Sequence, residues 1–240
     1  MSTVDMSADA VTARLREASR LRRTTIDLMR LGVASNIMNG VIEFVPATST
    51  DDAAQFENEG THVLCVDLGF AKARRSCGFV ADDEDGSELT FADCVGAVVK
   101  KLRDWGDECP VALVIEAPLS MRFESGNPVE RSFEARDGKH RGWYCNAGGG
   151  LYLGAQVFLR RLRQERFLCD RKVMLFEGFV TFKPPAATQV KPHVYDAKLL
   201  RDCLRGRSGV TRQEYVPDGE SILEGLFNIP GAPLVIEPTA

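Results

Sequence analysis

The chain has 240 residues, with 34 Asp and Glu against 30 Lys and Arg, which gives a formal net charge of −4 at pH 7. This length allows one domain with extensions or two small domains, and the charge excludes a protein that is basic overall, although a local basic groove remains possible. The seven Cys include no CxxC pair, and no apolar run approaches the length of a membrane span. We therefore expect reduced thiols in a cytoplasmic protein that has no membrane contact.

The first 60 residues are predicted to lie outside the main domain. Apolar residues recur at helical spacing over residues 8–33 with arginines around them, which predicts one amphipathic helix. The run "VIEFV" at 41–45 predicts a short strand, and the polar stretch after it is typical of a linker. We accordingly divide the chain into an N-terminal helix and linker, 1–60, and a main domain, 61–240.

From His62 onward, strands and helices follow one another in a regular order. Strands are predicted at 62–68, 76–81, 87–91, 111–116 and 172–182, and helices at 93–105, 151–168, 195–204 and 219–227. The predicted order begins with three antiparallel strands and continues with helix, strand, helix, strand and helix. This is the order of the RNase H fold. We therefore predict an α/β domain with an RNase H-like mixed five-stranded sheet and helices on both of its faces.

Acidic residues stand at the ends of apolar runs in three places. Asp67 ends the strand that begins at His62, Glu116 ends "VALVIE", and Asp196 opens the helix "YDAKLLRDCL". The carboxyl ends of parallel strands meet at one edge of a sheet, where ligands gather. Carboxylates brought together repel unless a cation lies between them, and Mg²⁺ or Mn²⁺ takes such oxygen ligands. The three acids therefore predict a metal site, although Asp67 shortly before a glycine is also typical of a turn.

A family resemblance runs through the same segments. "VLCVDLGFAKARRSCGFV", "LVIEAPLS", "FEGFVTFK" and "HVYDAKLL" resemble, in order and spacing, the motifs of an uncharacterised family of predicted RNase H-like nucleases. The resemblance covers roughly residues 60 to 237 and implies acidic site residues at Asp67, Glu116, Glu177 and Asp196. That family often has Asp where Glu116 stands, and its motifs imply a site rather than an activity.

The long segment after Glu116 is rich in basic and aromatic residues. It contains the candidate substrate-binding residues Arg131, Arg136, Arg141 and Trp143, and Lys183 after the fifth strand is a further candidate. Basic side chains interleaved with aromatic ones suit contact with phosphates and stacking on a base. The other interpretation is a flexible, solvated loop.

These features together predict a metal-dependent phosphodiester hydrolase, a nuclease acting on nucleic acid or a nucleotide. Asp67, Glu116 and Asp196 would coordinate Mg²⁺ or Mn²⁺, with Glu177 in support. One alternative is a nucleic-acid or nucleotide-binding module of the same fold that cleaves nothing. Another is an actin-like phosphotransferase, because "VDLG" also resembles the first phosphate loop of that superfold, but the chain has no second copy of the motif.

Overall fold

The computed structural model describes nine stretches of chain and three single residues. They are 42–58, 60–69, 75–136, 138–140, 148–165, 170–180, 191–207, 211–221 and 231–239, with Leu223, Phe227 and Ile229. The helix predicted over 8–33 lies outside the described residues.

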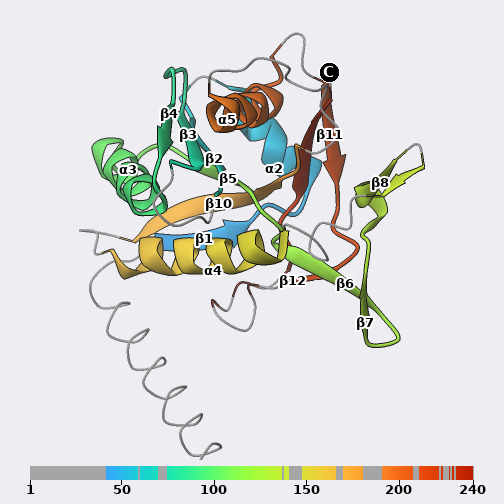
Figure 1. The fold of residues 1–240 in the computed structure, drawn as a ribbon. Coiled ribbons are helices and arrows are strands. Elements are labelled where there is room, and N and C mark those ends of the chain that lie inside the picture. Colours follow the sequence, from blue (N-terminus) through green and yellow to red (C-terminus); the bar gives the residue numbers. More distant parts are fainter. Residues whose placement is uncertain are drawn as a thin grey trace, which may run out of the picture.

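An eight-stranded sheet forms the centre of the molecule (Figure 1). Its strands are β1 (Ile42–Pro46), β2 (His62–Asp67), β3 (Cys77–Ala81), β4 (Ser87–Leu89), β5 (Val111–Glu116), β10 (Arg171–Gly178), β11 (Thr211–Tyr215) and β13 (Val235–Thr239). The order is β11-β13-β10-β5-β2-β3-β4, and β1 also pairs with β10. The pairs that join β1, β2, β5, β10 and β13 are parallel, whereas β3, β4 and β11 pair antiparallel with their neighbours.

The sheet is larger than the five strands predicted, because two segments share the outer edge of β10 and β11 pairs with one of them, β13. Strand β1 pairs with the first part of β10, from Ile42 opposite Arg171 to Pro46 opposite Leu175. Strand β13 pairs with its end, where Val235 lies opposite Glu177. The short strand predicted near 41–45 is therefore present, but it belongs to the main sheet although it precedes the predicted boundary at residue 61.

Helices cover both faces of the sheet, as predicted (Figure 1). They are α2 (Thr50–Ala54), α3 (Phe91–Asp104), α4 (Gly148–Gln164) and α5 (Pro192–Leu204), with the short 3-10 helices η1 (Gln55–Glu57) and η2 (Ser132–Glu134). Successive side chains of a strand point to opposite faces. Leu64 and Val66 of β2 accordingly pack in the core that α3 and α4 complete. Val63 and Cys65 pack in a second core with α5 and α2.

Short strands build most of the segment between β5 and α4. They are β6 (Ser120–Glu124), β7 (Asn127–Val129), β8 (Ala135–Arg136) and β9 (Lys139–His140), and β12 (Glu220–Ser221) pairs with β6. Two hairpins, β6–β7 and β8–β9, therefore replace much of the predicted loop. The helix predicted over 219–227 is wrong at its start, because Glu220 and Ser221 pair with the β6 edge as strand β12.

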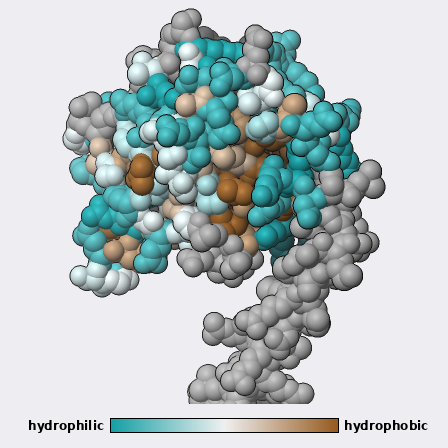
Figure 2. Space-filling view, turned by 180° about the vertical axis from the view of Figure 1, so that it is seen from behind, coloured by the Kyte–Doolittle hydropathy of each residue, from teal (hydrophilic) through white to brown (hydrophobic). Residues whose placement is uncertain are grey.

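Most of the buried apolar side chains lie in these two cores, and a smaller third cluster contains Phe133, Phe179 and Val235. Across the described ranges, no helix is long and apolar enough to cross a membrane. Figure 2 shows that hydrophilic residues cover most of the rear face, while apolar ones gather in a limited patch. Among the residues that the structure describes, the large apolar side chains that remain exposed are Val45, Phe123, Leu153, Val157 and Val216.

Candidate metal centre

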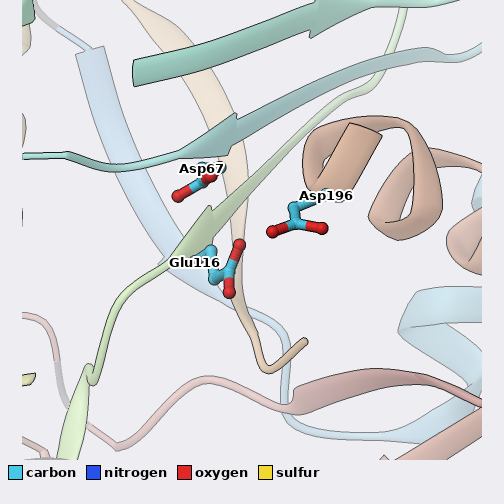
Figure 3. Close-up of side chains that lie close together, drawn as sticks. All are labelled: Asp67, Glu116 and Asp196. Atoms are coloured by element: carbon cyan, nitrogen blue, oxygen red, sulfur yellow. The ribbon is translucent and has the colours of Figure 1, made fainter. Parts of the chain in front are cut away.

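Three carboxyl groups converge at the carboxyl edge of the parallel strands. Asp67 and Glu116 are the last residues of β2 and β5 and lie directly opposite each other in the parallel register. Asp196 approaches from the second turn of α5, and Figure 3 shows the three carboxyl groups pointing toward one another. One oxygen atom from each residue lies within 4.8 Å of the others. The structure thus brings together the three acids that the sequence predicted as metal ligands.

The surroundings of these carboxyl groups favour a cation. Asp67 is 9% exposed and Asp196 is 8% exposed, whereas Glu116 is half-buried. Negative charges held this close and away from water repel one another strongly, and a divalent ion between them removes that repulsion. Three carboxylates form a donor set for a hard cation that prefers oxygen, such as Mg²⁺, Mn²⁺ or Ca²⁺. The residues present therefore fit a divalent metal ion.

Two glycines let helix α5 approach the sheet closely enough to bring Asp196 to the centre. A Cβ atom added at Gly78 of β3 would lie 1.9 Å from the backbone oxygen of His193. A Cβ atom at Gly178 of β10 would lie 2.7 Å from Cδ1 of Leu200. Because Gly78 also pairs with Asp67, the first of the three acids and the beginning of α5 meet at the same point of the sheet.

Substitution of Gly78 tests this packing. Gly78→Ala should lower the free energy of unfolding by about 1–3 kcal/mol, because the methyl group forces backbone atoms apart in a packed region. It should also weaken Mn²⁺ binding, since Asp196 moves with α5. Gly96→Ala is the matched control, because nothing lies within 4 Å of a Cβ atom at this exposed position of α3, and it should be neutral or slightly stabilising. Urea denaturation and Mn²⁺ calorimetry measure both effects, and equal stability of the two variants would contradict the close approach.

His193 contacts the centre and was not predicted from the sequence. Its Nδ1 atom lies 2.7 Å from Oδ2 of Asp67. Because an ionised carboxylate only accepts hydrogen bonds, Nδ1 is the donor. This hydrogen bond raises the pKa of His193 above its ordinary value of 6.5, although partial burial opposes the shift. His193 lies three residues before Asp196, on the same side of a helix, and that spacing was the available signal.

The ionisation of His193 gives a prediction for the metal-free protein. The folded state binds the imidazole proton more tightly than the unfolded chain does. The resulting stabilisation is complete below about pH 6.5 and is lost as pH rises through the folded-state pKa. It should be small, because the side chain is 37% exposed and solvent screens the charges. An NMR titration should show a lower pKa for His193 in Asp67→Asn, and an unchanged value would contradict the contact.

Glu177 does not join the three acids. It is fully buried and accepts hydrogen bonds from the Leu119 amide at 2.8 Å and from Nη1 of Arg131 at 2.7 Å. Burial raises the pKa of Glu177, and Arg131 and the Leu119 amide oppose the shift by stabilising the carboxylate. Glu177 therefore anchors the chain segment that follows Glu116 and is not one of the three grouped acids.

The structure also places Arg131 away from solvent. It is 1% exposed, and its guanidinium group donates to Glu177, to Glu134 at 2.8 Å and to Ser120 at 2.8 Å. An enclosed guanidinium that already binds two carboxylates is not available to a polyanion, so the substrate-binding role predicted for Arg131 is corrected. The predicted residues Arg141, Trp143 and Lys183, together with the side chain of Arg136, lie outside the described part of the chain.

No protein-family model, no curated protein and no solved structure matches this chain. The chemistry of the centre is therefore inferred from the residues that form it.

Proposed function

We propose that this protein is a metal-dependent phosphodiester hydrolase of RNase H-like fold, acting on nucleic acid or a nucleotide. The observation that supports it is the convergence of Asp67, Glu116 and Asp196 at the carboxyl edge of two parallel strands. The strand order β4-β3-β2-β5-β10 within the larger sheet is also the order expected for that fold.

The three carboxylates would hold Mg²⁺ or Mn²⁺ at the edge of the sheet. When bound, such an ion stabilises the charge that develops on a phosphate and makes a coordinated water more acidic. Asp67 and Glu116 are held by the β2–β5 pairing, and Asp196 by the packing of α5. Carboxylates fixed in this way need little reorganisation when substrate arrives, which favours catalysis.

Metal-dependent cleavage tests the proposal. The full chain is incubated with single- and double-stranded DNA, single-stranded RNA, an RNA–DNA hybrid and bis-nitrophenyl phosphate, with Mg²⁺ or Mn²⁺ and with chelator. We expect cleavage of at least one substrate, loss with chelator, and a fall of at least about a hundredfold in Glu116→Gln. The matched control, Glu124→Gln, changes an exposed glutamate at the end of β6 and should retain activity.

Two outcomes would contradict this function. Cleavage that persists with chelator, or in the Glu116→Gln variant, would show that the activity does not come from the three acids. Binding of Mn²⁺ with no cleavage of any substrate would favour the alternative of a non-catalytic nucleic-acid or nucleotide-binding module.

A further inference from the structure

The beginning of helix α5 supplies more to the candidate metal centre than one acid. Asp196 is one of the three grouped acids, and His193 lies three residues before it on the same side of the helix. Nδ1 of His193 donates a hydrogen bond of 2.7 Å to Oδ2 of Asp67, the acid that ends β2. One turn of α5 therefore contributes one of the grouped carboxylates and also contacts a second one.

The backbone of His193 is fixed where this contact requires it. A Cβ atom at Gly78 would lie 1.9 Å from the backbone oxygen of His193, and Gly78 is the β3 residue that pairs with Asp67. The first turn of α5 thus lies against β3 beside Asp67. Because Asp67 is only 9% exposed, water competes little for its carboxylate, and the hydrogen bond from His193 is correspondingly strong.

This hydrogen bond is compatible with a cation at the centre. An ionised carboxylate offers about four lone-pair sites on two oxygens, so Asp67 can accept from His193 and bind a metal ion at the same time. The hydrogen bond to Asp67 raises the pKa of His193 in the metal-free protein, and the charges of Glu88 and Asp196 add to the shift. The imidazolium form would be repelled by a bound cation, but a neutral imidazole with its proton on Nδ1 still donates.

We propose that His193 is a positioning residue of the metal centre, which holds the carboxylate of Asp67 in the orientation that binds the ion. The inference rests on the metal site of the proposed function, but it does not require cleavage. A carboxylate at the end of a strand can rotate about its side-chain bonds. Fixing it before the ion arrives removes an entropic cost of binding. Loss of such a supporting hydrogen bond typically weakens metal binding by roughly 10–100-fold.

Two substitutions of His193 test this role by Mn²⁺ calorimetry on the full-length chain. His193→Leu removes the donor and should weaken Mn²⁺ binding by at least about tenfold. His193→Asn keeps a donor, because Nδ2 of asparagine is as many bonds from the backbone as Nδ1 of histidine, and it should stay within about threefold of the wild-type affinity. Where His193→Leu does not fold, His193→Ala takes its place, since alanine removes the donor and favours a helix. The pH is set above the folded-state pKa of His193, so that no imidazolium repels the ion.

His62→Leu is the matched control. Nδ1 of His62 lies 2.8 Å from Oδ2 of Asp82, which is a contact of the same kind at the beginning of β2, whereas Asp67 ends that strand. The variant should leave the Mn²⁺ affinity unchanged, even where it lowers the melting temperature.

The outcomes separate this inference from the proposed function. Wild-type affinity in a folded His193→Leu, or an equal loss in His193→Leu and His193→Asn, overturns the positioning role and leaves the metal centre intact. If the wild-type protein binds no Mn²⁺, both the centre and the role of His193 are overturned. Weakened binding in His193→Leu that is recovered in His193→Asn supports the role even if the protein cleaves no substrate.

Discussion

Mn²⁺ should raise the melting temperature of the wild-type protein and leave that of Asp67→Asn almost unchanged. A ligand that binds only the folded state stabilises it by about 2.7 kcal/mol when its free concentration is a hundred times its dissociation constant. Asp67 supplies one of three carboxylates that lie within 4.8 Å of one another. Its replacement by a neutral amide removes both a ligand and a negative charge, so Mn²⁺ binding should be lost at the same concentration.

The metal-free state of the same variant gives a second readout. Asp67→Asn reduces the repulsion among the three acids, and the amide oxygen can still accept the hydrogen bond from His193. At a pH above the folded-state pKa of His193, where the charged His193–Asp67 pair no longer contributes stability, the metal-free variant should therefore be no less stable than the metal-free wild type. Asp85→Asn is the matched control, because its fully exposed side chain lies between β3 and β4 and should leave the Mn²⁺ response intact. Equal Mn²⁺ affinity of wild type and Asp67→Asn in calorimetry would falsify the centre.

Arg131→Met should lower the free energy of unfolding by about 3–5 kcal/mol, which is typical when one partner of a buried ion pair is removed. The guanidinium group of Arg131 is buried between Glu134 and Glu177, which are both fully buried. Its removal leaves two carboxylates close together without a counter-charge. Arg122→Met is the matched control, since Arg122 pairs at the surface with Glu124 and Asp218 and should cost at most about 1 kcal/mol.

The pH dependence of this loss identifies its cause. Burial already raises the pKa of Glu177 above the ordinary value of 4.5, and the loss of Arg131 should raise it further. A carboxyl group with a raised folded-state pKa contributes most stability below the unfolded value, and this contribution is lost as pH rises toward the folded value. The deficit of Arg131→Met should therefore be smaller at about pH 5 than near neutral pH in urea denaturation. It should also be smaller when Glu177→Gln is added. If the loss of stability in Arg131→Met depended neither on pH nor on Glu177→Gln, its cause would be lost packing rather than unpaired charge.

Local sequence determined the elements that carry the three acids. The apolar runs that end in Asp67 and Glu116 predicted two buried strands, and the structure has both, paired in parallel so that their last residues meet. The helix predicted from Tyr195 is present as α5, although it begins earlier, at Pro192. Parallel strands place their carboxyl ends at one edge, so the order of the elements predicted that Asp67 and Glu116 lie at the same edge of the sheet. The pairing of β2 with β5 makes them direct neighbours there.

Tertiary structure decided which polar residues came together away from those strand ends. Arg131 and Glu177 are 46 residues apart, and no local pattern predicts that they pair in the interior. The contact between His193 and Asp67 spans 126 residues and depends on the absence of a side chain at Gly78. Strands β1 and β13 share one edge of β10 although they lie near opposite ends of the chain. Periodicity within a segment reports which side of an element is buried, but the partner across the interface is selected by packing among segments that are distant in the sequence.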